Sequence, residues 1–268
     1  MNRPSCPVRV LAPVLAAGSL LAAGACASDD GSARAVAVSP AVERTPSPSA
    51  TPALTKAGAT AALITTADLE GDWTRANDPA TWRNTLLVDK VDVAGFLTAK
   101  TDAAECQRLL DSLYSDSLLG RASGASAITG FTDPHARLFY QVGDYGRDSL
   151  TKTLDWLGSL PDKCSQFTAT GSDGSKRTVQ VVAAKLPAAG DARQGVTVTV
   201  RGTAGGQPTT LTLDVAALRV GASGAAVTNG GPDGASHTST EAAVREGARR
   251  LADVLAGKTP TTNPSEFD

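Results

Sequence analysis

The sequence predicts an α+β fold, in which a twisted, mainly antiparallel sheet carries helices packed on one face. Residues 195–201 and 209–215 alternate strictly between aliphatic and polar side chains, which is typical of strands with one buried and one wet face. Residues 149–160 and 239–255 repeat leucine, valine and alanine at helical spacing. We expect these elements to belong to one folded domain, residues 54–256, that follows a signal peptide and a linker.

The N-terminus predicts a lipoprotein signal peptide over residues 1–25. Two arginines precede an uncharged apolar run that is shorter than the roughly 20 residues of a membrane-spanning helix. The run closes with small residues directly before Cys26. It resembles a bacterial lipobox, in which the thiol of the first mature residue is coupled to a diacylglycerol. We therefore expect Cys26 to be lipidated with fatty-acyl chains such as palmitate; the alternative is plain secretion with Cys26 left as a free thiol.

The segments on either side of the domain have the composition of disordered chain. Residues 26–53 hold the lipidated cysteine and then proline, serine, threonine and alanine, which bury too little apolar surface to fold. Residues 257–268 form a tail interrupted by two prolines. We expect the linker to hold the domain away from the membrane.

The charge of the mature chain excludes one class of partner. Without residues 1–25, Lys+Arg falls from 25 to 23 against 27 acidic residues, a net charge of −4. A nucleic-acid-binding protein would carry a basic face. The partners we expect are the membrane, through the lipid anchor, and an unknown ligand or protein of the cell envelope.

Two cysteines remain in the expected domain, Cys106 and Cys164. In a chain exported to an oxidising compartment, two thiols most simply form one disulfide. The metal alternative has little support, because these cysteines and the two histidines, His135 and His237, match no familiar zinc spacing. We expect no metal and no cofactor.

The first half of the domain is expected to hold three elements. Residues 57–65 form a short helix, a turn follows that delivers Trp73 to the core, and residues 85–93 are a strand or irregular. Asp102 and Glu105 are spaced as a capping box that opens a second helix, with Cys106 on its apolar face.

The second half is expected to be mostly hairpins. Pro161 should end the helix over 149–160, and Thr238 and Glu241 should cap the final helix. The expected strands, with their turns between them, are 126–132 and 136–142, 166–170 and 177–184, 195–201 and 209–215, and 218–220 and 225–228.

No catalytic motif is visible. The chain holds neither Gly-x-Ser-x-Gly nor a phosphate-binding glycine loop. His135 and His237 have no acidic residue at a suggestive spacing and are interpreted as solvated loop residues. Residues 229–234 are rich in glycine but lack the alternating acids of a calcium loop. We expect that the protein is not an enzyme.

Several short motifs in one order resemble a known family. Leu63–Leu69 reads Leu-x-x-x-Ala-Asp-Leu and leads to Trp73; a cysteine in a helix, a strand and a helix that ends in a second cysteine follow, and then Leu218–Gly221 precedes the last helix. This resembles the extracellular sensor domain of PknH-type serine/threonine kinases and the free-standing actinobacterial lipoproteins that carry it. The resemblance implies an α+β fold with a ligand-binding cleft and no known chemistry. Members commonly have two disulfides, whereas this chain has thiols for one.

Together these observations predict a membrane-anchored lipoprotein on the outer face of the cytoplasmic membrane, with a non-catalytic, sensor-like domain that binds a ligand or partner. The wet face of the sheet is the expected site. Trp73, Trp82 and Tyr145 are the aromatic side chains available to line it, although packing in the core is the expected role of each. Two alternatives remain open: a cell-envelope hydrolase whose site is assembled from distant residues, and a purely structural or interaction lipoprotein.

Overall fold

The computed structural model describes residues 53–261. The expected signal peptide, Cys26 and almost all of the linker lie outside the described residues, as does the end of the tail. Within them, packing begins at Leu54, which is buried, and the last helix ends at Leu255.

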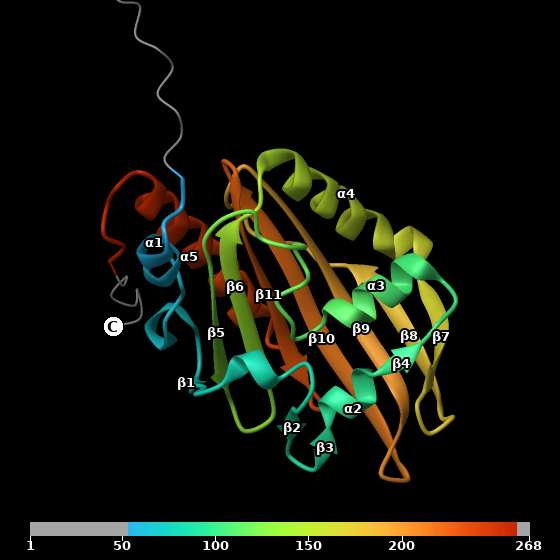
Figure 1. Ribbon diagram of the computed structural model, residues 1–268. Coiled ribbons are helices and arrows are strands. Elements are labelled where there is room, and N and C mark those ends of the chain that lie inside the picture. The colour runs from blue at the N-terminus through green and yellow to red at the C-terminus, as the bar shows by residue number, and fades with distance from the viewer. Residues whose placement is uncertain (1–52, 262–268) are drawn as a thin grey trace, which may run out of the picture. The chain divides into compact units, whose positions relative to one another are not determined.

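One antiparallel sheet of nine strands forms the centre of the domain, in the order β1-β5-β6-β11-β10-β9-β8-β7-β4 (Figure 1). A separate hairpin pairs β2 with β3. The strands are β1 (Thr74–Arg75), β2 (Leu87–Val88), β3 (Val91–Asp92), β4 (Ala99–Lys100), β5 (Ser126–Thr132), β6 (Arg137–Asp144), β7 (Gln166–Gly171), β8 (Lys176–Ala183), β9 (Ala192–Ala204), β10 (Gln207–Val220) and β11 (Ser223–Gly231).

Five α-helices and two short 3₁₀ turns accompany the sheet in the described part of the chain. None of these helices combines the length and the apolar character needed to cross a bilayer. The helical elements are α1 (Lys56–Ala61), η1 (Thr66–Asp68), η2 (Pro79–Thr81), α2 (Val93–Leu97), α3 (Ala104–Ser112), α4 (Arg147–Lys163) and α5 (His237–Leu255).

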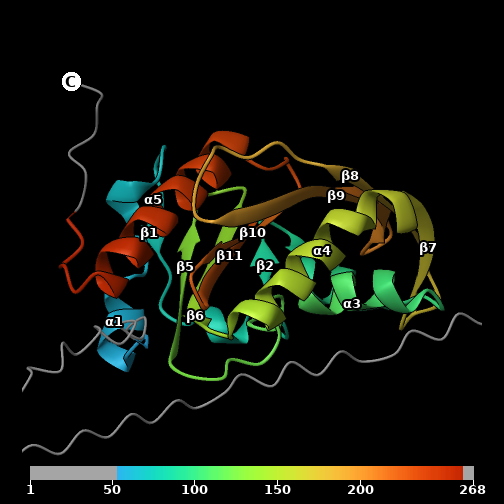
Figure 2. The ribbon, with the colours of Figure 1, turned by 90° about the horizontal axis from the view of Figure 1, so that it is seen from above.

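The α+β class and the antiparallel sheet are confirmed, but helices cover both faces of the sheet rather than one. Figure 2 shows α5 on one side and α3 with α4 on the other. Each side has its own apolar core, and β10 contributes to both: Leu213 packs on the α4 side and Leu218 on the α5 side. Every residue of β11 is buried, so neither face of this strand can be wet.

The wet surface expected on the sheet is restricted to strands that α5 does not cover, such as β8 and β9. On β9, Val196, Val198 and Val200 are buried. Thr197 and Thr199 are half-buried, and Arg201 is exposed. This confirms the alternation that predicted the strand.

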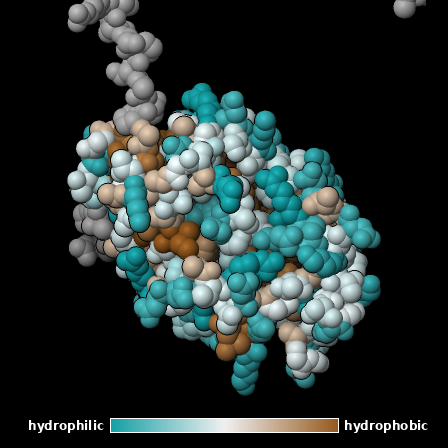
Figure 3. Space-filling view, in the orientation of Figure 1, coloured by the Kyte–Doolittle hydropathy of each residue, from teal (hydrophilic) through white to brown (hydrophobic). Residues whose placement is uncertain are grey.

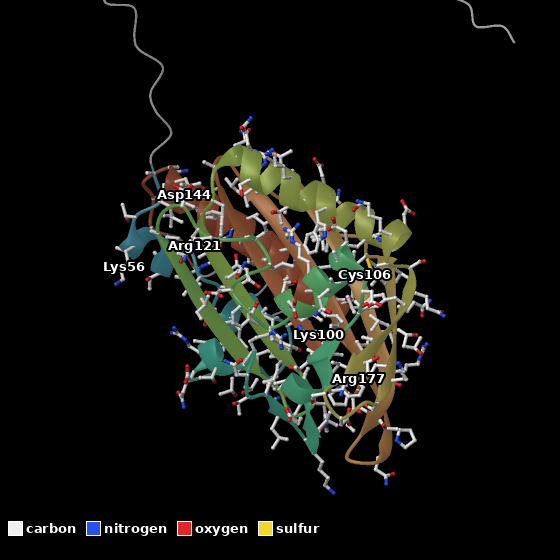
Figure 4. The ribbon with its side chains drawn as sticks, turned by 45° about the vertical axis from the view of Figure 1, so that its right-hand side comes forward. Lys56, Lys100, Cys106, Arg121, Asp144 and Arg177 are labelled. Carbon is white, nitrogen blue, oxygen red and sulfur yellow. A yellow bond between two sulfur atoms is a disulfide. The ribbon has the colours of Figure 1, made fainter. Side chains whose placement is uncertain are left out.

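The expected disulfide joins Cys106 on α3 to Cys164 at the end of α4, with 5.7 Å between the two Cα atoms. Both residues are buried, and Figure 4 shows the sulfur atoms between the two helices beside the labelled Cys106. The bridge therefore fastens the α3 segment to the helix that packs directly on the sheet.

The predicted helix boundaries were wrong at four places, the first of them in α1, which ends at Ala61 instead of residue 65. Ala103 is the N-cap of α3 and makes no side-chain cap bond, so the box at Asp102 does not form. Ser236 caps α5 by accepting a hydrogen bond from the backbone N–H of Ser239, two residues before the expected cap. Pro161, which was expected to end α4, lies inside the helix, and α4 continues to Lys163.

The Leu63–Leu69 motif is explained by a buried contact with α5. Asp68 accepts hydrogen bonds from the backbone and hydroxyl of Thr65, at 2.7 and 2.8 Å, and lies 3.4 Å from Nη1 of Arg250. Arg250 also donates to the backbone oxygens of Leu63 and Ala61, at 2.7 and 3.1 Å. Both ionic side chains are buried, so the pair links the N-terminal segment to α5.

Candidate functional site

The three aromatic side chains that were available to line the wet face are buried, as expected of packing residues. Trp82 packs in the α4-side core against Tyr114 and Phe139. Tyr145 is buried in the same core, and its burial raises the pKa of its hydroxyl. Trp73 borders a cavity beside the N-terminal end of α5, and this cavity is the candidate site because a histidine and several acidic residues also line it.

The cavity has a volume of about 310 Å³, the lower end of the range for small-molecule sites. Three segments that are far apart in the sequence surround it: the stretch before β1, the β5–β6 turn and the β11–α5 loop. The lining residues are Glu70, Gly71, Trp73, Asp133, His135, Ala136, Asp233, Gly234, Ala235, Ser236 and Ser239.

Hydrogen bonds fix the wall of the cavity next to α5. The indole N–H of Trp73 lies 3.0 Å from the backbone oxygen of Glu70 and 3.2 Å from Oγ of Ser239. The amide of Asn229, a fully buried residue, donates to the backbone oxygen of Ser236 at 2.8 Å. Trp73 is therefore held in position by the same residues that cap the helix.

An imidazole and two carboxylates converge at the rim of this cavity. Nδ1 of His135 lies 3.0 Å from Oδ2 of Asp89 and 3.1 Å from Oδ2 of Asp233. Asp133 accepts a hydrogen bond from the backbone N–H of His135 at 3.0 Å. The hydrogen bond to Asp89 and the negative charges of all three aspartates raise the pKa of His135.

Hydrogen bonds from the side chain of Arg137 to backbone oxygens hold these loops in position. The guanidinium of Arg137 donates to the backbone oxygens of Asp133 and Ala136, both at 2.7 Å, and to that of Leu87 at 3.0 Å. It thereby joins the β2–β3 hairpin, which carries Asp89, to the β5–β6 turn. Gly231 is required where the third loop passes, because a Cβ there would overlap the backbone oxygen of His135.

The second histidine also has acidic partners. Nδ1 of His237, the first residue of α5, lies 2.8 Å from Oδ2 of the buried Asp214. Thr197 donates its hydroxyl to the other oxygen of Asp214 at 2.7 Å, and Nε2 of the imidazole lies 3.7 Å from Oε1 of Glu241. The hydrogen bond to Asp214 raises the pKa of His237, with smaller contributions from the charges of both acids.

The interpretation of both histidines as simple solvated loop residues was therefore incomplete. Each has a side chain about half exposed and at least one carboxylate within hydrogen-bonding distance. The separation of His135 from Asp89 is 46 residues, and spacing along the chain gives no signal for such a pair. The signal that was present is local: His135 lies in an Asp-Pro-His turn between two well-predicted strands.

The surface offers few large apolar side chains. The face seen in Figure 3 is mainly hydrophilic with small hydrophobic patches. Among residues 53–261, the large hydrophobic side chains classed as exposed are Leu87 at 61% and Val182 at 47%. Leu87 is on β2, two residues before Asp89.

Similarity to known proteins is found in solved structures rather than in sequences. No family model matches the chain, and no curated protein matches it. Among solved structures, the extracellular domain of PknH from Mycobacterium tuberculosis is similar, with a TM-score of 0.41 and 10% sequence identity. The match covers 78% of this chain and 100% of that chain. A likeness this distant concerns the general fold and says nothing about what the present chain binds.

Proposed function

We propose that this chain is an extracytoplasmic lipoprotein, anchored by acylated Cys26, whose α+β domain binds an envelope ligand or partner without catalysing a reaction. The observation that supports the location best is the buried Cys106–Cys164 disulfide. Disulfides persist in oxidising compartments and are rare in the cytosol. Two acyl chains on Cys26 would make the anchor stable, because one chain binds a membrane only marginally.

The binding part of the proposal is supported by the cavity beside Trp73. It combines an aromatic wall with carboxylates, an imidazole and the polar N-terminal end of α5. Such a mixture of apolar surface and a few convergent polar groups is typical of small-ligand sites. A sensor or accessory role requires no more than such a site on an exported domain.

Intact-mass measurement and cell fractionation test the anchor. The full chain is expressed in an actinobacterial host, with Cys26→Ala as the matched control. We expect the wild-type chain in the membrane fraction, with cleavage before Cys26 and the added mass of fatty-acyl chains, and the variant outside that fraction. An unmodified Cys26 would refute the lipoprotein proposal, and recovery from the cytosol with both inner thiols reduced would refute the location.

The Asp214–His237 pair favours a second candidate, the envelope hydrolase. A carboxylate that binds Nδ1 of an imidazole orients Nε2 to act as a base. In the described part of the chain, however, the group recorded next to Nε2 is Glu241 rather than a nucleophilic hydroxyl or thiol. Ester hydrolysis by the purified chain that disappears in His237→Gln would favour this candidate over the binding protein; we expect no such activity.

A further inference from the structure

We propose that Asp89, His135 and Asp233 form a binding site for a divalent transition-metal ion, Zn²⁺ or one of similar ligand preference, at the rim of the Trp73 cavity. The sequence alone predicted no metal. The three residues come from three different loops, and only the fold brings their side chains together. The proposal goes beyond the proposed function, because it concerns neither the lipid anchor nor the identity of the envelope ligand or partner.

Two of the three distances between the ligand atoms fit a shared ion. One oxygen from each aspartate and Nδ1 of His135 all lie within 4.8 Å of one another. Two ligand atoms bound to one ion at about 2.0–2.2 Å, with an angle of 90–110° between them, are about 2.8–3.6 Å apart. The two Nδ1-to-oxygen distances, 3.0 and 3.1 Å, fall within this range.

Hydrogen bonds among Asp89, His135 and Asp233 explain this arrangement less completely than a shared metal ion does. Nδ1 of His135 carries at most one hydrogen, yet oxygens of both Asp89 and Asp233 approach it at hydrogen-bonding distance. One proton cannot serve both with good geometry. Asp133 adds a third negative charge beside the same imidazole. A divalent ion would accept all three ligand atoms and balance more of this charge than a single proton does.

The ligand types favour a particular class of ion. An imidazole with two carboxylates suits Zn²⁺ and related transition metals, whereas Ca²⁺ and Mg²⁺ prefer oxygen ligands alone. Three protein ligands leave coordination positions for water or another molecule, which is the arrangement of an open zinc site. The cavity that His135 and Asp233 help to line provides space for that additional ligand.

The loops are also held in place independently of the ion. Arg137 links the Asp89 hairpin to the His135 turn. The hydroxyl of Tyr114, a fully buried residue, donates to the backbone oxygen of Gly230 at 2.7 Å, just before the loop that carries Asp233. Because these supports are built into the fold, replacing a ligand residue should remove the ion without unfolding the domain.

Calorimetric titration with zinc chloride tests the proposal on the purified mature chain after treatment with a chelator. We expect one saturable site, abolished by His135→Gln and weakened by Asp89→Asn or Asp233→Asn by at least the roughly 10- to 100-fold that loss of a hydrogen-bond partner of a ligand costs. His237→Gln is the matched control, since it removes the other imidazole that has acidic partners, and it should bind Zn²⁺ as the wild type does.

Cobalt absorption and thermal unfolding complete the experiment. Bound Co²⁺ should show a visible absorption band that is missing in His135→Gln, and equal melting temperatures of the apo variants would show that they are folded. The absence of saturable binding, or binding that survives His135→Gln, would overturn the metal site. A protonated His135 between two aspartates would then explain the cluster. Neither result would alter the mass-spectrometric test of the anchor.

Discussion

Replacement of Arg250 by methionine should be one of the most destabilising single changes in this domain. The side chain donates to two backbone oxygens of the N-terminal segment and lies against the buried Asp68. Methionine keeps much of the packing volume but leaves Asp68 buried without its cation. Removal of one partner of a buried ion pair costs about 3–5 kcal/mol, because the remaining charge is neither paired nor hydrated.

Urea denaturation followed by tryptophan fluorescence measures this effect. With an m-value of about 3 kcal/mol/M, the midpoint should fall by about 1–1.7 M. Arg249→Met is the matched control on the same helix, because Arg249 is partly exposed and its main partner, Glu246, keeps Arg245 at 3.7 Å after the change. Partly exposed pairs of this kind contribute roughly 0–1 kcal/mol.

A double-mutant cycle separates the ion pair from general damage to the helix. Asp68→Asn combined with Arg250→Met should cost clearly less than the sum of the two single changes, by about 1 kcal/mol or more. Additive effects, or a loss for Arg250→Met no larger than for Arg249→Met, would refute the assignment of Asp68 and Arg250 as a coupled pair.

Three further predictions concern other parts of the domain. Replacement of both bridged cysteines by alanine should cost about 4 kcal/mol, since the bridge closes a loop of 58 residues; urea denaturation measures this, and a loss near zero would show that the bridge is dispensable. The imidazole of His237, whose pKa is raised mainly by its hydrogen bond to Asp214, should titrate by NMR above about 6.5 and return toward this value in Asp214→Asn. Its contribution to stability is complete below the unfolded-state pKa and is lost as the pH rises through the folded-state pKa, so His237→Gln should reduce the decline in stability over that window. Gly247→Ala should destabilise α5, because the new Cβ would overlap the hydroxyl of Tyr140. Within residues 53–261 that hydroxyl has no hydrogen-bond partner, so Tyr140→Phe should be close to neutral alone and should partly restore Gly247→Ala.

The sequence predicted most of the sheet because its strands carry their own signals. Strand β5 matches the predicted range, and the alternation correctly identified the apolar face of β9 and β10. The other face of β10 was expected to be wet, but Asp214 and Ala216 on it are buried. The distribution of the helices was harder to predict. Strand β11 consists largely of glycine, alanine and other small residues, and such a strand gives no hydrophobic pattern, although it is buried between helices on both faces.

The candidate site could not be predicted in the same way. His135 and its acidic partners belong to three loops, and their convergence depends on strand order and on backbone contacts such as those of Arg137. The pairing of His237 with Asp214, 23 residues apart, also depends on the folded arrangement of the strands and could not be predicted from the sequence. By contrast, the disulfide was predictable, because only two thiols remain in the expected domain.

The first described residues and the Trp73 cavity lie at opposite ends of α5. Leu54 lies at the C-terminal end of this helix, beside Val254 and Leu255, whereas Trp73 lies at its N-terminal end. A helix of 19 residues is about 28 Å long. The start of the described chain and the cavity are therefore separated by about the length of this helix, so a ligand could reach the cavity without contacting the segment that enters at Leu54.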